Sequence, residues 1–287
     1  MSDDTDRNIH PLLQQGKIMA MPGVYDVLSA KVAERVGFPG VVLTGYGFAA
    51  SYLGEPDFGL FTQTEILDTA RRIIGAVNVG VIVDGDTGHG GPLNVQRMVR
   101  ELIMMGAAGV ILEDQQWPKR CGHMRGKSVI EAEEHAAKIR AAVDARGDQH
   151  LMITARTDSL ATHGIDEAIR RAKLYKEAGA DVLFVEGPED RVQLERIGKE
   201  LPGPLAVNLI EGGTTPMCSL EDLREMGYFS VGFVLSGLYA VTRALEDTYR
   251  TIRSNGSSAG INMMQFEEFN DLIGANERIA IDDQFKT

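Results

Sequence analysis

One pattern recurs four times along this chain of 287 residues: a helix-like stretch ends at a glycine, a small or aromatic residue follows, and a short apolar run comes next. The four glycines are Gly37, Gly106, Gly179 and Gly227. A glycine just past the last turn of a helix readily takes the left-handed conformation that closes it. The repeated pattern therefore predicts a chain in which helices lead directly into buried strands.

Further apolar runs lie between these units, so that the chain contains eight short segments of the buried-strand type, each followed by a helical pattern. They span residues 18–21, 41–44, 81–83, 110–113, 151–154, 182–185, 205–207 and 231–234. Strands that alternate with helices form parallel sheets with right-handed crossovers. Eight such strands in roughly 230 residues favour an α/β fold of the closed (β/α)8 TIM-barrel type. The alternative is an open, doubly wound sheet.

The tail of the chain, residues 254–287, differs from the rest. It begins with a glycine- and serine-rich stretch of linker composition. Phe266, Phe269 and Ile273 then fall at i, i+3 and i+7, which predicts a helix with one apolar stripe. We therefore expect a barrel domain over 1–253 and a helical arm that packs either on its own barrel or on a neighbouring subunit, and we favour the neighbour.

Charge and cysteine content narrow the range of partners. Lys and Arg number 29 and Asp and Glu 41, which gives a net charge of −12 and argues against nucleic acid and anionic membranes as partners. No apolar run approaches the ~18 residues of a membrane-spanning helix, and the first residues lack the apolar core of a signal peptide. Cys121 and Cys218 are too few for a disulfide framework. The sequence predicts a cytoplasmic protein that acts on a small molecule.

Polar side chains come directly after the predicted strands. Carboxylates follow the third and fourth strands at Asp84, Asp86 and Glu113, and Arg156 ends the fifth. The other polar positions at strand ends are Thr44, Gly45 and Tyr46 after the second strand, Glu186 after the sixth, Asn208 and Glu211 after the seventh, and Ser236 after the eighth. Because the carboxyl ends of barrel strands converge, these groups should face one pocket. Three acidic strand ends and an arginine indicate a cation and an anionic substrate.

Asp84 and Asp86 form a carboxylate pair at i and i+2 just past a buried strand. Hard oxygen ligands of this kind suit Mg²⁺, which keeps several waters and takes one or two carboxylates. Glu113, at the end of the next strand, could complete the coordination directly or through water. The alternative is a solvated acidic turn, which is common for Asp-Gly sequences.

A long loop is expected after the fourth strand. Residues 117–127 hold four cationic side chains, a thiol and an imidazole and show neither strand nor helix periodicity. Long irregular loops in compact domains are often lids. The cationic neighbours would favour the thiolate of Cys121, and a thiol there could serve as a nucleophile or a proton donor. The alternative is a basic surface loop with an incidental cysteine.

These segments resemble the isocitrate lyase/phosphoenolpyruvate mutase superfamily over nearly the whole chain. The segments that carry the resemblance are MPGVYDVLSAKV, TGYGFAASYLGEPDFGL, DGDTGHGGPLNVQR, LEDQQWPKRCGHMRGK, ARTDSL, AGADVLFVEGP and NLIEGGTTP. The KRCGH segment at 119–123 is typical of the carbon–carbon lyases of this superfamily, which cleave 2-alkylmalates, dimethylmalate and methylisocitrate, although carboxyphosphonoenolpyruvate mutases carry it as well. The resemblance also implies a final helix that swaps with a neighbour, in a homotetramer built from two helix-swapped dimers.

The resemblance implies a role for each candidate residue. Asp84 would bind Mg²⁺ directly, Mn²⁺ being a possible substitute, and Asp86 and Glu113 would hold metal-bound waters. Cys121 would be the general acid. Substrate-binding positions would be Thr44, Gly45, Tyr46, Asp57, Lys119, Gly122, His123, Arg156, Glu186, Asn208, Glu211 and Ser236, with Tyr46 and Arg156 also counted as catalytic. Val234 stands where oxaloacetate hydrolases tend to have a hydroxyl residue, and its apolar side chain suits an alkyl group better than a gem-diol.

The expected reaction is a retro-Claisen cleavage of a 2-hydroxydicarboxylate. The C2 hydroxyl would lose its proton beside the metal, the C2–C3 bond would break, and Cys121 would protonate the resulting carbanion. Tyr46 and a carboxylate near the metal are both candidates for the base. Three alternatives stay open: hydrolysis of oxaloacetate to oxalate and acetate, a phosphonomutase reaction, and a catalytically silent binding protein on the same barrel.

Overall fold

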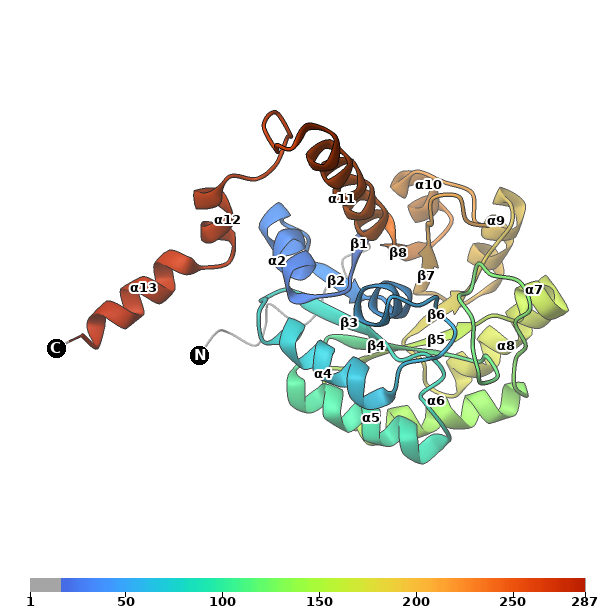
Figure 1. Cartoon of the computed structure of the whole chain (residues 1–287). Helices are drawn as coiled ribbons and strands as arrows, with labels where there is room; N and C mark the ends of the chain where they lie inside the picture. The colour runs from blue at the N-terminus through green and yellow to red at the C-terminus, as the bar shows by residue number, and fades with distance from the viewer. Residues whose placement is uncertain (1–16, 287) are drawn as a thin grey trace.

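Eight parallel strands close into a barrel in the computed structural model of the chain, which describes residues 17–286 (Figure 1). The strands are β1 (Met19–Val24), β2 (Gly40–Leu43), β3 (Gly80–Asp84), β4 (Gly109–Glu113), β5 (Met152–Thr157), β6 (Val182–Val185), β7 (Leu205–Asn208) and β8 (Tyr228–Phe233). Each strand pairs with its neighbour in sequence, and β1 also pairs with β8, so the sheet has no edge. The (β/α)8 prediction is confirmed, and the doubly wound alternative is wrong.

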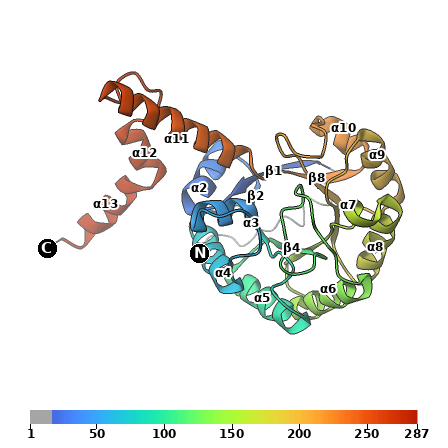
Figure 2. The same ribbon diagram turned by 45° about the vertical axis from the view of Figure 1, so that its right-hand side comes forward.

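Helices surround the strands in the ring that Figure 2 shows. They are α2 (Val27–Val36), α3 (Gly45–Phe48), the π-helical turn η1 (Ala49–Leu53), α4 (Gln63–Ile74), α5 (Pro92–Met105), α6 (Ala132–Arg146), α7 (Leu160–His163), α8 (Ile165–Glu177), α9 (Arg191–Glu200) and α10 (Leu220–Glu225). The predicted closing glycines are left-handed, with φ of 96° at Gly37 and 78° at Gly106. In α5, Val95, Val99 and Leu102 face the sheet at helical spacing and are fully buried.

The two faces of the sheet pack in two different apolar clusters. Val81 and Val83 of β3 pack in the large cluster shared with the helices, whereas Ile82 between them packs with residues of the other cluster, such as Met21 and Met152. This alternation is typical of a strand that is buried on both faces. The polar side chains are left to the carboxyl ends of the strands, where the site lies.

The connection from β4 to α6 is the predicted long loop. It runs over residues 114–131 and has only an isolated bridge between Gln115 and Val129. Two hydrogen bonds join the two ends of the loop to each other: Gln116 N–H donates to the Ser128 carbonyl at 2.8 Å, and Ile130 N–H donates to the Asp114 carbonyl at 2.9 Å. The middle of the loop folds over the barrel mouth.

The last three helices, α11 (Ser236–Asn255), α12 (Phe266–Leu272) and α13 (Ala275–Gln284), project from the barrel as an arm (Figure 1). None of the three has a buried residue. The predicted apolar stripe is present on and just after α12, and Phe266 is 82% exposed. No helix in the described part of the chain is long and apolar enough to cross a bilayer.

Candidate active site

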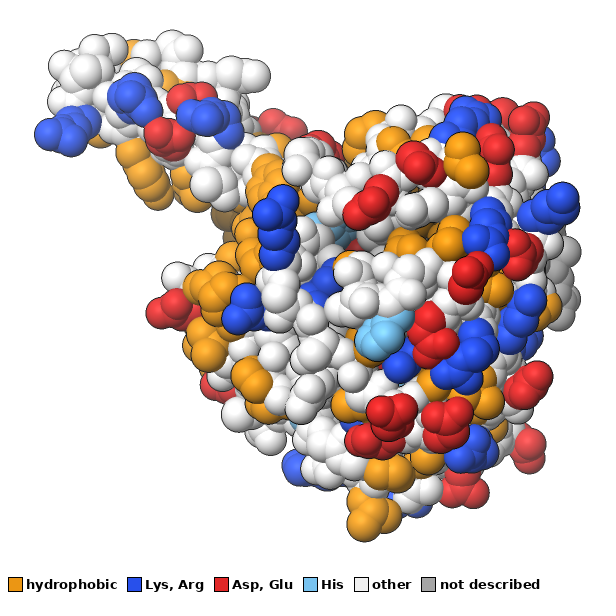
Figure 3. Space-filling model, turned by 90° about the vertical axis from the view of Figure 1, so that its right-hand side faces the viewer, with side chains coloured by type: hydrophobic (Ala, Val, Ile, Leu, Met, Phe, Trp, Pro, Cys, Tyr) orange, Lys and Arg blue, Asp and Glu red, His pale blue; other side chains and the backbone are white. Residues whose placement is uncertain are grey.

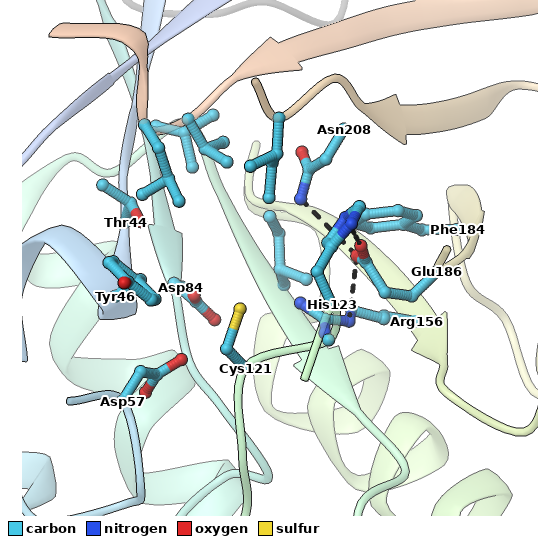
Figure 4. A pocket seen from close by; sticks show the side chains of 16 residues that line it. Thr44, Tyr46, Asp57, Asp84, Cys121, His123, Arg156, Phe184, Glu186 and Asn208 are labelled. Carbon is cyan, nitrogen blue, oxygen red and sulfur yellow. Dashed lines mark hydrogen bonds and ion pairs between the residues drawn. The ribbon is translucent and has the colours of Figure 1, made fainter. Parts of the chain in front are cut away.

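A cavity opens at the carboxyl ends of the strands, under the long loop (Figure 4). Predicted site residues that line it are Thr44, Tyr46, Asp57, Asp84, Cys121, Gly122, His123, Arg156, Glu186 and Asn208. The rest of the lining is apolar and consists of Val42, Ile111, Phe184, Ile210, Val234 and Leu235. The cavity therefore combines ionisable groups with a hydrophobic wall, which suits an anion that carries an alkyl group.

Asp84 forms one side of the cavity at the end of β3. Its Oδ2 accepts the Gly45 N–H at 3.1 Å, and its Oδ1 accepts the Asp86 N–H at 3.2 Å. A Cβ on Gly45 would lie 3.0 Å from Asp84 Oδ2, so the glycine permits this close approach. Thr44 caps α3 by accepting the Gly47 N–H at 3.3 Å. Gly45 thus supports Asp84 and does not itself line the cavity.

Lys119 lies behind the cavity in a buried ion-pair cluster. Its Nζ is 2.7 Å from Asp57 Oδ1 and 2.6 Å from Asp86 Oδ1. Burial alone would lower the pKa of Lys119, but the two carboxylates hold it well above its usual value. Burial raises the pKa of Asp86 to about 7, against the lowering effect of Lys119. Lys119 therefore joins three loops and does not line the cavity.

Arg156 forms the opposite side, at the end of β5. It donates to Asp158 through two bonds, from Nε at 2.9 Å and from Nη2 at 3.0 Å. Its guanidinium is also 3.4 Å from Glu113 and 3.4 Å from Glu186. Burial alone would raise the pKa of Glu186, but Arg156 and the His123 ring lower it to about 2. This side of the cavity therefore holds a fixed cation beside the ionised Glu186.

His123 connects the long loop to Glu186 after β6 (Figure 4) and to the loop after β7. Its Nε2 lies 2.7 Å from Glu186 Oε1, and its Nδ1 accepts the Thr214 N–H at 2.9 Å. The Thr214 N–H assigns the ring proton to Nε2. A Cβ on Gly122 would lie 2.3 Å from Arg156 Nη2, so only glycine lets the loop lie this close to Arg156.

The Cys121 side chain lies between the Asp84 and Arg156 sides of the cavity (Figure 4). Its N–H donates to the Asp57 carbonyl at 3.1 Å, which fixes its place in the loop. Burial raises the pKa of the Cys121 thiol to about 11. The expectation that nearby cations favour a thiolate is therefore wrong, because burial and the carboxylates of Asp57 and Glu186 outweigh the lowering effect of Arg156. A neutral thiol is the form that can donate a proton.

Two predicted site residues lie at the rim. Ser236 Oγ donates to Glu211, and Glu211 is exposed. Neither lines the cavity. His89 does not line the cavity either: its ring packs between those of Phe61 and Trp117, with centroid distances of 5.8 Å and 5.6 Å.

Sequence reasoning missed the role of Asp158 and, apart from Val234, the apolar wall. The spacing of Asp158, two residues after Arg156, was an available signal, since residues i and i+2 of a strand share a face. Phe184, Ile210 and Leu235 gave no signal, because apolar residues stand at every strand of a barrel.

The acidic groups fit a cation held partly through water. Within the described residues, no three His, Cys, Asp or Glu side chains form a ready-made metal cluster. Asp86 Oδ2 and Glu113 Oε1 are nevertheless buried with no hydrogen-bond partner among those residues, close to the cavity-lining Asp84. Buried carboxylate oxygens need compensation. Hard oxygen donors of this number suit Mg²⁺ with retained waters.

The fold and the site together define a barrel enzyme that binds a small anion between an acidic cation site and a buried arginine. The chain belongs to the phosphoenolpyruvate phosphomutase family, whose model matches residues 9–253. It is an enzyme of the isocitrate lyase/phosphoenolpyruvate mutase superfamily, as the sequence resemblance predicts.

Three curated relatives are similar over most of their length. The petal death protein of Dianthus caryophyllus is 48% identical over 97% of this chain and 88% of its own. The chloroplastic carboxyvinyl-carboxyphosphonate phosphorylmutase of Arabidopsis thaliana is 50% identical over 92% of this chain and 80% of its own. The 2,3-dimethylmalate lyase of Eubacterium barkeri is 42% identical over 99% of both chains.

A solved structure of oxaloacetate acetylhydrolase with the inhibitor 3,3-difluorooxalacetate superposes with a TM-score of 0.93. It is 32% identical, over 98% of this chain and 97% of the other. Relatives of one fold thus have names that describe lyase, mutase and hydrolase reactions, and the choice among them depends on the site.

Proposed function

We propose that this chain is a Mg²⁺-dependent carbon–carbon lyase. Its substrate is a 2-hydroxydicarboxylate of the 2-alkylmalate or 2-methylisocitrate type, and its products are a 2-oxoacid and a second carboxylic acid. The observation that carries the proposal is the neutral Cys121 thiol, which lies between the acidic side and Arg156 of a cavity with an apolar wall. A proton donor at that place is what cleavage to a carbanion requires.

The chain's own residues account for binding and for the last proton transfer. Arg156 and Asn208 bind one carboxylate, and the backbone around Thr44 and Tyr46 faces the hydroxyl end. The C2 hydroxyl gives up its proton, C2 becomes a carbonyl, and the C2–C3 electron pair moves onto the second acid. Cys121 then donates its proton to C3 and takes another from solvent when the products leave. Tyr46 and a carboxylate near the cation remain the two candidate bases.

Asp84 would be the direct ligand of Mg²⁺, and Asp86 and Glu113 would hold its bound waters. Bound there, it would supply Lewis-acid stabilisation of the C2 oxygen. We expect Asp84→Ala to abolish turnover and EDTA to do the same, with recovery on adding Mg²⁺ or Mn²⁺. Asp148→Ala, in an exposed turn, is the matched control and should keep wild-type activity. Full activity in excess chelator would refute the metal requirement.

The apolar wall favours cleavage of an alkylated substrate over hydrolysis. Val234, Leu235 and Ile210 place no hydroxyl group on this side of the cavity. An alkyl substituent gains free energy by leaving water there, by about 0.8 kcal/mol per buried methylene. Oxaloacetate hydrolysis is the second candidate, because the acetylhydrolase structure superposes so closely.

The deciding experiment supplies the enzyme with Mg²⁺ and a panel of 2-alkylmalates, 2-methylisocitrate, oxaloacetate and phosphonopyruvate, and identifies products by NMR. The proposal expects a 2-oxoacid from the first two classes, with kcat/KM highest for an alkylated substrate. Oxalate and acetate as the dominant products would establish the hydrolase. A carbon–phosphorus rearrangement would establish the mutase, and no turnover of any substrate would leave a binding protein.

We propose further that the enzyme is a homotetramer of helix-swapped dimers. Hydrophobic side chains lie on the protruding arm and on the barrel surface beside it (Figure 3). A groove of about 790 Å³ between α2 and α11 is lined mostly by apolar side chains, among them Leu28, Val32, Val241 and Leu245. An arm from a second copy would cover this surface. The cytoplasmic location expected from the sequence stays a prediction.

A further inference from the structure

A buried carboxylate that does not line the cavity lies directly behind its arginine. Asp114 is fully buried. Its Oδ2 accepts hydrogen bonds from Thr157 Oγ1 at 2.7 Å, Tyr175 OH at 2.8 Å and Arg171 Nη1 at 3.1 Å, and its Oδ1 accepts the Asp158 N–H at 2.9 Å. Four donors from the end of β5 and from α8 therefore converge on one carboxylate.

Asp158 connects Asp114 to the Arg156 side chain in the cavity. Its backbone is fixed by Asp114, and its carboxylate holds Arg156 through two bonds, at 2.9 and 3.0 Å. Asp158 also lies 3.4 Å from Lys127 of the long loop. Asp158 thus sets the orientation of the Arg156 guanidinium, and Asp114, which does not line the cavity, sets the position of Asp158.

The backbone of Asp114 extends the same connection. Its N–H donates to the Arg156 carbonyl at 3.2 Å, and its carbonyl accepts the Ile130 N–H at 2.9 Å, where the long loop returns to the barrel. Arg171 Nη1 donates to the Ile130 carbonyl as well, at 2.7 Å. One residue therefore joins the ends of β4 and β5, the loop and α8.

We propose that Asp114 is a positioning residue for substrate binding, which holds the Thr157–Asp158 corner and through it the ion pair that orients Arg156. The charge of Asp114 matters as well as its shape, because an ionised carboxylate only accepts hydrogen bonds. An asparagine of the same size would turn an NH2 group toward one of the four donors and leave it unpaired. This proposal depends on the proposed function in one respect only: the ligand that Arg156 binds is an anion.

The first test compares Asp114→Asn with Asp181→Asn. Asp181 is the matched control, because it also accepts from a backbone N–H (Ile153, 2.8 Å) and from an arginine (Arg146), but at the other end of the barrel. Crystal structures of both variants without ligand should show the Arg156–Asp158 pair broken in Asp114→Asn and intact in Asp181→Asn. An intact pair in Asp114→Asn would overturn the proposal.

The second test measures oxalate binding by calorimetry in the presence of Mg²⁺. The dissociation constant should rise about 10- to 100-fold in Asp114→Asn, because a buried donor is left without its hydrogen-bond partner. In Asp181→Asn it should stay within about two-fold, although both variants lose thermal stability. Equal weakening in the two variants would show a structural role only.

Tyr175→Phe keeps the proposal testable if Asp114→Asn does not fold. It removes one donor to Asp114, and oxalate binding should weaken about 2- to 10-fold. Tyr228→Phe is its control, since that hydroxyl is buried and donates to the Leu194 carbonyl at 3.3 Å. Unchanged binding in Tyr175→Phe would count against the proposal. If the wild-type enzyme does not bind oxalate, the proposed function loses its ligand class, and the crystallographic comparison still decides the role of Asp114.

Discussion

At the residue scale, burial decides the protonation state of the groups that carry the chemistry. Cys121 keeps its proton because its side chain is shielded from water, and Glu186 loses its proton because Arg156 lies 3.4 Å away. Residue types at strand ends predicted which groups meet in the cavity. They could not predict these protonation states, since burial and pairing are set by contacts between distant parts of the chain.

The first prediction concerns Cys121. Cys121→Ser keeps the size of the side chain but offers a far weaker acid, so turnover of a 2-alkylmalate should fall by at least ~100-fold. Binding of oxalate should barely change. Cys218→Ser is the control and should keep wild-type turnover, because Cys218 does not line the cavity. Normal cleavage by Cys121→Ser would show that another group donates the proton.

The pH dependence of alkylation tests the same thiol independently. With a pKa of about 11, only about one Cys121 in a thousand is a thiolate at pH 8. Reaction with iodoacetamide should therefore be slow at pH 8 and accelerate about ten-fold per pH unit up to about 11. A rate that levels off near pH 8.5 would contradict the raised pKa.

The second prediction concerns His135, a fully buried ring on α6 that packs edge-on against Tyr175 at 4.6 Å. Burial lowers its pKa to about 3, so the folded chain keeps the ring neutral while the unfolded chain protonates it below pH 6.5. Its contribution to stability is complete above pH 6.5 and is lost as the pH falls toward 3, by about 1.4 kcal/mol per pH unit.

Urea unfolding between pH 7.5 and pH 4.5 measures this effect. The free energy of unfolding should fall less steeply with pH in His135→Phe than in the wild type. His163→Phe, at an exposed position, should follow the wild-type curve. Parallel curves for all three proteins would mean that His135 does not titrate as the burial implies.

At the element scale, the sequence was most informative where residues close together in the chain determine the structure. All eight strand segments and the closing glycines were predictable, because buried runs and left-handed caps are local signals. The short α3 (Gly45–Phe48) and η1 (Ala49–Leu53) after β2 were not predicted. The direction of Lys119, away from the substrate and toward Asp57 and Asp86, depends on two other loops.

The third prediction concerns closure of the long loop. Trp117 is the only tryptophan, is 45% exposed, and packs on Gly59 and His89, so its emission reports the position of the loop without interference. Oxalate with Mg²⁺ should shift the emission and protect residues 115–128 from limited proteolysis. Oxalate without metal should do neither, and Asp84→Ala should give a flat titration.

Calorimetry supplies the check on this result. If oxalate binds while emission and cleavage stay unchanged, the loop over residues 114–131 is a static part of the mouth. The loop would then be a surface loop that does not close over the cavity. Cys121 would still line the cavity.

At the scale of the whole molecule, the described part of a single chain provides no surface that buries the apolar side chains of the arm. α11, α12 and α13 bury no residue, and the only ion pair between the stripe-bearing helix and the barrel within the described chain joins Arg35 and Glu268 at 3.5 Å across an exposed surface. An exposed pair of this kind contributes little. The fourth prediction is that the wild-type enzyme elutes as a tetramer of the 31.3 kDa chain in light-scattering chromatography.

Variants in the arm test this assembly. Deletion of residues 254–287, or the double change Phe266→Asp and Phe269→Asp, should shift the mass to smaller species. Val192→Asp is the control, because Val192 is equally apolar and 70% exposed but lies on α9, away from the arm. A wild-type mass of one chain at micromolar concentration would refute the tetramer.

The pairing of three cations at and behind the cavity with carboxylates has a consequence for how a substrate arrives. Lys119, Lys127 and Arg156 are each matched by buried carboxylates, and the chain as a whole carries a net charge of −12. A dianionic substrate is therefore repelled at long range and attracted only after it has entered. Dissolved ions screen such repulsion beyond about 10 Å at 0.1 M. Raising the ionic strength from 0.01 to 0.1 M should thus increase kcat/KM, whereas an enzyme that steers its substrate electrostatically slows down under the same change.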